Sequence, residues 1–230
     1  MKILLTSARA AAALILVTAC ASGPAHAAPD LPKPATDLPA AKPGTTRTAV
    51  LAGGCFWCIE AVFEPLKGVS DVASGYAGGT KESASYEEVS AGKTGHAESV
   101  RITYDPAKIS YGQLLLVYFT LHDPTTKDRA GPDHGHQYRS AIFYQDAEEQ
   151  RVAAAYIRQL EAAKVYPAPI VTTLEPLDGF YPAEAYHQDF VRLHPDHPYV
   201  RQWSVPKVEK LNARFNELLA APPAAAKKTN

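Results

Sequence analysis

The strongest constraint on the fold comes from a segment that reads GGCFWCIE, at Gly53–Glu60. A short apolar run, Ala49–Leu51, precedes it, and apolar residues then recur with helical spacing as far as Leu66. The order of apolar run, double glycine and amphipathic repeat predicts a strand, a tight turn and a helix. Cys55 therefore falls at or just before the N-terminus of that helix.

Two thiols, those of Cys55 and Cys58, lie one helical turn apart at this point. Backbone N–H groups are unpaired in the first turn of a helix, and together with the helix dipole they favour a negative charge. A cysteine placed there ionises more readily than the free residue, whose pKa is about 8.5. We therefore expect Cys55 to be the nucleophile, with Cys58 close enough to react with whatever forms on it.

The first residues of the chain have the form of a secretory signal. Lys2 and Arg9 precede an apolar stretch, Ala10–Ala19, which is too short to cross a bilayer as a mature helix. Two processing routes are open: cleavage before Cys20, which would become a lipidated N-terminus, or cleavage after Ala27. Both routes predict an exported bacterial protein that is either periplasmic or anchored to a membrane by lipid.

The rest of the chain divides into a linker, one domain and a tail. Residues 28–46 hold too few large apolar side chains to offset the entropy of ordering, so we predict a disordered linker. From a lipidated Cys20 to Thr46 the chain would span roughly 80 Å as extended polyproline. The expected order is a signal over residues 1–27, the linker, a single domain over residues 47–219 and a disordered tail over residues 220–230.

Charge and cysteine content exclude several classes of protein. Without the signal, 21 Lys and Arg stand against 24 Asp and Glu, a net charge near −3, and no basic stripe indicates nucleic acid as a partner. Cys55 and Cys58 are the only cysteines of the predicted domain, and a bridge that closes a two-residue gap constrains the unfolded chain little. The pair therefore indicates chemistry rather than stabilisation. We expect the protein to be a monomer.

Strand and helix signals alternate along the predicted domain. Strands are expected over Val69–Gly75, His96–Tyr104, Ser140–Tyr144 and Ile170–Leu174, helices from Ser110 to Thr120 and from Asp146 to Ala163, and helical pieces broken at Pro195, Pro198 and Pro206 over Ala183–Leu219. Such alternation predicts an α/β or α+β domain built of two layers.

A Cys-x-x-Cys pair alone is compatible with three kinds of site: half of a zinc site, a disulfide oxidoreductase, or a nucleophile with its resolving thiol. Zinc would need two further ligands. The histidines that could supply them have no finger spacing, and they are His134, His136, His194 and His197. The two aromatics between the thiols, Phe56 and Trp57, either line an apolar pocket that suits a methyl group or anchor the helix start in the core. We expect no metal.

Two further segments carry polar groups that could act beside the thiols. Glu98 stands near the start of an expected strand, and Tyr86 lies twelve residues before it. Tyr138 belongs to a polar loop that contains glycine and leads into another strand. Taken singly, such a glutamate is usually a solvated surface charge, and such a tyrosine is usually a core residue with a satisfied hydroxyl.

Taken together, three motifs resemble those of the A-type peptide-methionine sulfoxide reductases. They read GCFWC at 54–58, GHAE at 95–98 and QYRS at 137–140, and the resemblance covers roughly residues 47–205. It implies a two-layer α/β sandwich with a ferredoxin-like core and extra elements. Many members of the family resolve their oxidised cysteine with a thiol near the C-terminus. This chain has none there, so the resemblance leaves Cys58 as the resolving thiol.

The resemblance also implies a role for each residue. Cys55 would attack the sulfur of methionine-S-sulfoxide, and Glu98, kept protonated by a partly apolar pocket, would donate to the oxygen. The hydroxyls of Tyr86 and Tyr138 would help. A sulfenic acid on Cys55 would condense with Cys58 to a disulfide, which an external dithiol such as thioredoxin or a thioredoxin-like protein would reduce. The residues implied to bind substrate are Phe56, Trp57, Asp133 and His187.

The function expected from the sequence is therefore the reduction of methionine sulfoxide in oxidised proteins, without a prosthetic cofactor, with free methionine sulfoxide as a further candidate substrate. The first alternative is a thioredoxin-like thiol–disulfide oxidoreductase, which would place small or polar residues between the thiols and would not need Glu98. The second is a lipoprotein without enzymatic activity that binds a metal or another ligand through its histidines.

Overall fold

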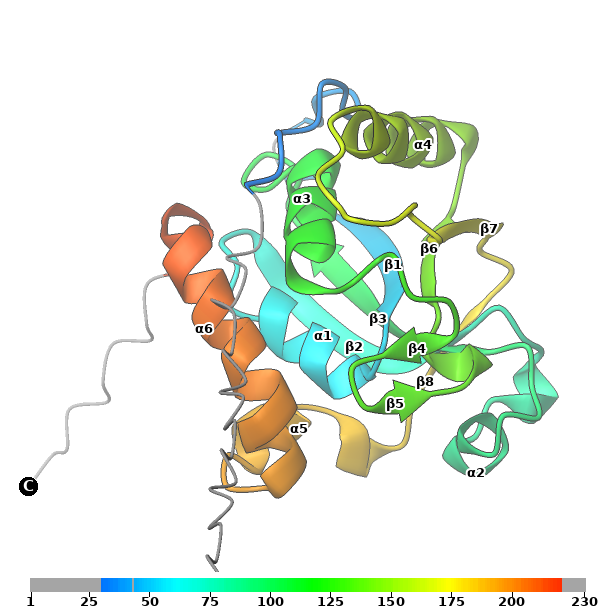
Figure 1. Cartoon of the computed structure of the whole chain (residues 1–230). Helices are drawn as coiled ribbons and strands as arrows, with labels where there is room; N and C mark the ends of the chain where they lie inside the picture. The colour runs from blue at the N-terminus through cyan, green and yellow to red at the C-terminus, as the bar shows by residue number, and fades with distance from the viewer. Residues whose placement is uncertain (1–29, 43, 221–230) are drawn as a thin grey trace, which may run out of the picture.

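The computed structural model describes residues 30–42 and 44–220, and Figure 1 draws the rest of the chain in grey. The predicted signal, both of its cleavage sites and all but the first residue of the predicted tail lie outside the described residues. Within the described ranges, no helix combines the length and the apolar character that a membrane span requires.

A six-stranded sheet with the order β7-β6-β1-β3-β2-β8 forms the centre of the fold (Figure 1). Its strands are β1 Arg47–Gly53, β2 Val69–Ala77, β3 Ala97–Tyr104, β6 Ser140–Tyr144, β7 Thr173–Pro176 and β8 Phe180–Pro182. Neighbouring strands are antiparallel except for β6 and β7, which are parallel. The expected alternation of strands and helices is confirmed, and the chain has a mixed α/β fold.

Helices cover one face of this sheet. They are α1 Phe56–Phe63, α3 Tyr111–Leu121, α4 Ala147–Ala162 and α6 Val205–Arg214. Side chains of a strand point alternately to the two faces. Leu51 and Ile102 accordingly join the main core with the helices, whereas Val50 and Ala52 belong to a smaller apolar cluster on the other face.

Two helices begin where the sequence predicts, because their caps are local. The Ser110 hydroxyl accepts from the backbone N–H of Gln113 and the Gln113 side chain accepts from the backbone N–H of Ser110, which starts α3. The Asp146 carboxylate accepts from the backbone N–H groups of Glu148 and Glu149 at the start of α4. These bonds satisfy N–H groups that no helical carbonyl can reach.

The region after α4 differs from the expectation in two places. The strand expected over Ile170–Leu174 is shifted to Thr173–Pro176, because the N–H of Val171 donates to the carbonyl of Pro124 in a loop instead of to the sheet. Pro206, expected to break a helix, lies in the first turn of α6. Its missing N–H needs no partner there.

Short elements complete the described chain. They are η1 Lys81–Ser83, α2 Tyr86–Ser90, β4 Arg129–Ala130, β5 Asp133–His134, η2 His136–Tyr138, η3 Ala185–His187, α5 Phe190–Leu193, the π-helical turn η4 Val200–Ser204 and η5 Asn216–Leu218. In Figure 1, β4 and β5 lie beside the N-terminal end of α1.

The described residues before β1, 30–42 and 44–46, correct the expectation of a disordered linker over residues 28–46. Asp37 accepts hydrogen bonds from the Ser110 hydroxyl and from a backbone N–H in the first turn of α3. Leu31 and Leu38 pack against the main core. Figure 1 shows this segment in blue beside α3 and α4. A few acceptor and apolar groups at the right spacing thus order a stretch whose average composition indicates disorder.

Candidate active site

A glycine turn fixes the position of Cys55. β1 ends at Gly53, and Gly54 has φ +97°, a left-handed conformation that favours glycine. A Cβ added to Gly54 would lie 2.3 Å from the Cβ of Ala130 in β4, so the approach of β4 also requires glycine. The turn places Cys55 at the N-cap of α1, as the sequence predicts.

The two cysteines form a buried pair of free thiols, with Cys55 8% exposed and Cys58 1% exposed. Burial raises the pKa of Cys55 well above its ordinary value, and the neighbouring Cys58 and Glu98 raise it further. A hydrogen bond from Cys55 lowers the pKa of Cys58 to about 6, with smaller contributions from Lys207 and Ser204. The expectation that Cys55 ionises more readily than a free cysteine is not supported, because burial raises its pKa, whereas its hydrogen bond to Cys58 lowers the pKa of Cys58.

Glu98 explains why the helix N-terminus does not serve Cys55. The backbone N–H of Phe56, in the first turn of α1, donates to Oε2 of Glu98 at 3.0 Å, while the Cys55 side chain makes no capping bond. Burial raises the pKa of Glu98 to about 8, although the bond from Phe56 acts in the opposite direction. The carboxyl is therefore mostly protonated at neutral pH, which is the state that the hypothesis from the sequence requires.

Two tyrosines and an aspartate lie around Cys55 and Glu98. Tyr86 begins α2 and Tyr138 ends η2. Burial raises the pKa of both phenols, and the nearby charges of Glu98 and Cys55 raise it further. Asp133, in β5, acts in the same direction on Tyr138 and on Glu98. The fold thus brings together residues from three parts of the sequence: Cys55, the pair Tyr86 and Glu98, and the pair Asp133 and Tyr138.

Phe56 and Trp57 occupy different environments. Phe56 is 1% exposed, and its ring packs against Tyr76 and against His187, with 5.0 Å between the ring centres of Phe56 and His187. Trp57 is only partly buried, and its ring stacks on that of Phe190 at 3.7 Å. Phe56 therefore anchors the helix start in the core, whereas Trp57 keeps accessible surface beside the thiols.

His187 joins the start of α1 to η3. The indole N–H of Trp57 donates to Nδ1 of His187 at 3.1 Å, so the hydrogen of the neutral ring is on Nε2. Burial lowers the pKa of His187, which favours this neutral form. Nε2 is buried and no described residue accepts its hydrogen bond. Because the ring centre of His187 lies 4.4 Å from that of Tyr86, this unused donor is close to a predicted catalytic tyrosine.

Two residues near the cysteines were not predicted from the sequence. The Tyr199 hydroxyl donates to Asp133 at 2.5 Å and also lies near Cys55. The Ser204 hydroxyl lies 3.2 Å from Sγ of Cys58. Their positions depend on how η4 packs against α1, and a long-range contact of this kind leaves no motif or periodic signal in the sequence.

The four histidines considered as zinc ligands do not converge. His136 contacts Asp128, whereas His194 and His197 pack against the ring of Phe190. Nowhere in the part of the chain that the structure describes do three or more His, Cys, Asp or Glu side chains come together as a metal site. The zinc interpretation has no support among these residues.

Comparisons with known proteins agree on one family. The family model described as peptide methionine sulfoxide reductase matches residues 47–219. The chain is 54% identical over 184 residues to peptide methionine sulfoxide reductase MsrA 2 of Mesorhizobium japonicum, over 80% of this chain and 94% of that protein. It is 52% identical over 171 residues to MsrA of Thermus thermophilus, over 74% of this chain and 96% of that protein.

Two solved structures are similar as well. Reduced Mxr1 of Saccharomyces cerevisiae has a TM-score of 0.63 and 32% identity, covering 68% of this chain and 90% of that chain. Methionine sulfoxide reductase A of Corynebacterium diphtheriae has a TM-score of 0.58 and 30% identity, covering 72% of this chain and 89% of that chain.

Proposed function

Since the chain belongs to the peptide methionine sulfoxide reductase family, we propose that it reduces methionine sulfoxide in proteins to methionine. One observation carries the proposal: the buried carboxyl of Glu98 is held beside the Cys55 thiol through the N–H of Phe56. A thiol displaces oxygen from a sulfoxide only when that oxygen receives a proton or a strong hydrogen bond, so the acid and the nucleophile must meet the same ligand. A thiol–disulfide exchanger does not need this acid.

The groups of the site account for every proton and electron of the oxygen transfer. Cys55 attacks the sulfur of the sulfoxide. The thiol proton of Cys55 passes to Cys58, to which the Cys55 thiol already donates a hydrogen bond. Glu98 gives its proton to the oxygen, while the hydroxyls of Tyr86 and Tyr138 donate hydrogen bonds to it. The oxygen moves to Cys55 as a sulfenic acid, the S–O bond of the substrate breaks, and methionine leaves. The sulfur of the substrate gains two electrons and that of Cys55 loses two.

The oxidised enzyme is then returned to its starting state by thiols. Cys58 attacks the sulfur of the Cys55 sulfenic acid, its proton joins the departing hydroxyl, and water and a disulfide result. The family relies on a thiol reductant and no prosthetic group. We propose a thioredoxin-like dithiol protein as the natural donor, since two electrons and two thiols are needed to open the bridge.

The substrate side follows from the aromatic environment. The accessible ring of Trp57 would contact the S-methyl group, and Phe56 would support that pocket from the core. Asp133, held in place by the hydrogen bond from Tyr199, would orient polar groups of the substrate. His187, whose Nδ1 accepts from the indole N–H of Trp57, would hold that ring in position against the substrate. A fixed acid and a fixed methyl pocket discriminate the two epimers at sulfur, and the family resemblance assigns the S epimer to this site.

We infer a ferredoxin-like core for the central part of the fold. The order β6-β1-β3-β2, with all neighbours antiparallel, supports it, as do α1 between β1 and β2 and α3 between β3 and β6. β7 and β8 then extend the sheet at its two edges.

We further propose that the protein is exported from a bacterial cell, is monomeric, and works either in the periplasm or from a lipid anchor on Cys20. The apolar N-terminal stretch and its two competing cleavage sites support export. Mass spectrometry of the protein isolated from membranes and from the periplasm would separate a lipidated Cys20 from a chain that begins at Ala28.

Turnover of separated epimers tests the function. Residues 28–230 are assayed with dithiothreitol and a peptide that carries either the S or the R form of methionine sulfoxide. We expect turnover of the S form only, and none for Cys55→Ser. With a thioredoxin-like donor, Cys58→Ser should consume one equivalent and stop with sulfenic acid on Cys55. Disulfide exchange without turnover of either epimer would reject the proposal in favour of a thioredoxin-like oxidoreductase.

A further inference from the structure

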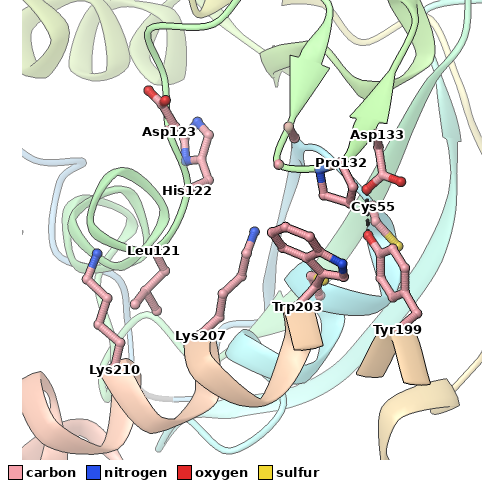
Figure 2. Close-up of a pocket in the computed structure, with 13 residues that line it drawn as sticks. Cys55, Leu121, His122, Asp123, Pro132, Asp133, Tyr199, Trp203, Lys207 and Lys210 are labelled. Carbon is pink, nitrogen blue, oxygen red and sulfur yellow. Dashed lines mark hydrogen bonds between the residues drawn. The ribbon is translucent and has the colours of Figure 1, made fainter. Parts of the chain in front are cut away.

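A cavity of about 320 Å³ opens beside the cysteine pair on the side of α6 (Figure 2). Cys55 and Cys58 both border it, and η4 and α6 contribute Trp203, Lys207 and Lys210 to its wall. Of the residues of the proposed sulfoxide site, Glu98, Tyr86, Tyr138 and Trp57 do not line it, whereas Asp133 does. The cavity therefore adjoins the proposed sulfoxide site and shares Cys55 and Asp133 with it.

The Lys207 side chain borders this cavity, and no described residue forms a hydrogen bond or an ion pair with its ammonium. Lys210, by contrast, donates to the carbonyl of Thr120 at the end of α3. Lys207 is partly buried, and Figure 2 shows its side chain extending from α6 among the residues that line the cavity. Of the two carboxylates of the wall, Asp123 accepts from the loop that follows it, and Asp133 accepts from Tyr199. Burial raises the pKa of Asp133, and the charge of Lys207 opposes this rise, so Lys207 acts on Asp133 without a direct bond to it. A partly buried cation beside two thiols suits an anionic ligand.

Ser204 supports Cys58 from the same side. Ser204 is fully buried, and its hydroxyl lies 3.2 Å from Sγ of Cys58. It ends the π-helical turn η4, and such irregular turns are frequent at functional sites. Lys207 follows Ser204 by one turn, so the hydroxyl and the ammonium lie on neighbouring parts of one helix face. Together they offer a hydrogen bond and a positive charge to a thiolate at Cys58.

We propose that this cavity is the site where the reducing thiol opens the Cys55–Cys58 disulfide. In this proposal Lys207 attracts the negative charge of the reductant, and Ser204 donates a hydrogen bond to the Cys58 sulfur as it leaves. The occupant is the thiolate of a dithiol that carries acidic groups near its sulfur. The inference rests on the proposed function, because that function supplies the disulfide.

A dithiol alone supplies the electrons and the proton that reduction of the disulfide requires. Its thiolate attacks Sγ of Cys55, which is more exposed than Cys58, and forms a mixed disulfide while the Cys55–Cys58 bond breaks. Cys58 leaves as a thiolate, held by Ser204 and Lys207. The second thiol of the reductant then attacks the mixed disulfide, and its proton passes to the departing Cys55. The reductant ends as a disulfide, and the pair regains one proton and one negative charge.

The cavity meets the proposed sulfoxide site at Cys55 and Asp133. The hydrogen bond from Tyr199, at the start of η4, to Asp133 in β5 is dashed in Figure 2 and lies at this edge of the cavity. After burial, the charges of Glu98 and of Asp133 raise the pKa of Tyr138, so Asp133 lies close to the proposed sulfoxide site as well. The reductant and the sulfoxide would therefore share this edge of the cavity.

Reduction of the preformed disulfide tests the proposal. The mature protein is oxidised with one equivalent of the S epimer in one arm and with diamide in a second arm. The return of free thiols is then followed by stopped flow with neutral dithiothreitol and with dimercaptosuccinate, which carries two carboxylates. Lys207→Gln should slow reduction by dimercaptosuccinate about tenfold and reduction by dithiothreitol less than about twofold. The exposed Lys93 offers a matched control, and Lys93→Gln should slow neither.

Ser204→Ala separates the two parts of the proposal. Both reductants should then react about three- to tenfold more slowly, because the leaving sulfur loses its hydrogen bond whatever the charge of the reductant. The midpoint of Cys58 ionisation, read from the ultraviolet absorbance of the thiolate, should also rise. A purely structural role for Ser204 would not move that midpoint.

Two results would overturn the proposal. In the first, Lys207→Gln retains wild-type rates with both reductants. In the second, Lys207→Gln weakens the binding of methionine sulfoxide and leaves reduction unchanged, which would assign the cavity to the substrate. Failure of the S epimer to oxidise the pair would instead reject the proposed function, and the diamide arm would still decide where the reductant acts.

Discussion

The backbone N–H of Phe56 donates a hydrogen bond to the carboxyl of Glu98, across 42 residues of sequence. This bond ties the first turn of α1 to β3, so the proposed acid and the neighbouring Cys55 move as one unit. It also gives the helix N-terminus to the acid instead of to the thiol. The protonation state of each group therefore depends on the other.

Glu98→Gln should lower the rate at which the S epimer oxidises the cysteine pair by about two to three orders of magnitude, because the amide cannot donate a proton. In the wild type this rate should fall as pH rises through about 8, where the carboxyl loses its proton, and the variant should lack this fall. Single-turnover measurements across pH provide the test. Glu60, a second buried glutamate with its pKa raised by burial to about 7, is the control, and Glu60→Gln should keep the fall near 8.

In the reduced enzyme, the thiol of Cys58 should ionise to a thiolate near pH 6. Cys55→Ala should raise this midpoint, because the hydrogen bond from Cys55 is the main cause of the low value. Cys58→Ala should abolish the step near pH 6. The ultraviolet absorbance of the thiolate reports both outcomes, and a step near pH 6 that survives in Cys58→Ala would place the charge on Cys55 instead.

Gly54→Ala should destabilise the domain by about 2–4 kcal/mol, from the left-handed backbone and from contact with Ala130. Gly44 provides the matched comparison, since its φ is +80° and a Cβ there would meet no atom within 4 Å. Gly44→Ala should therefore cost only about 1–2 kcal/mol, the backbone part. Urea unfolding of both variants measures the difference, and equal losses would show that the approach of β4 does not constrain the turn.

Asp37→Ala should lower the free energy of unfolding by about 1–2 kcal/mol, because Asp37 accepts hydrogen bonds from Ser110 and from the first turn of α3. Asp30→Ala is the control: its carboxylate is fully exposed in its contact with Arg214, and an exposed pair contributes little. Thermal unfolding at neutral pH compares the two. If both variants matched the wild type, residues 30–42 would not be held through Asp37.

The parts of the fold that the sequence predicted well have local causes. The starts of α3 and α4 follow from Ser110 and Asp146, which act within one turn. The turn before Cys55 follows from two glycines. These signals need no knowledge of the rest of the chain, so the positions of the elements could be read directly.

The parts that the sequence did not predict depend on distant contacts. The rule that a helix N-terminus favours a thiolate was overridden by the burial of Cys55, and Glu98 from β3 takes the first N–H of α1. Ser204 became a neighbour of Cys58 only through the packing of η4 on α1. Leu31 gained a place in the core although the residues around it are those of a flexible chain. No short window of sequence contains any of these partnerships.

The contacts of Leu31 and Asp37 with the domain shorten the distance over which an anchored form could work. With a lipid on Cys20, only residues 20–30 would separate the anchor from the first described residue, at most about 30 Å at polyproline extension, instead of roughly 80 Å for residues 20–46. An anchored enzyme would then work only within this short distance of the bilayer. The length of the segment between the anchor and the domain would limit which oxidised proteins can reach the active site.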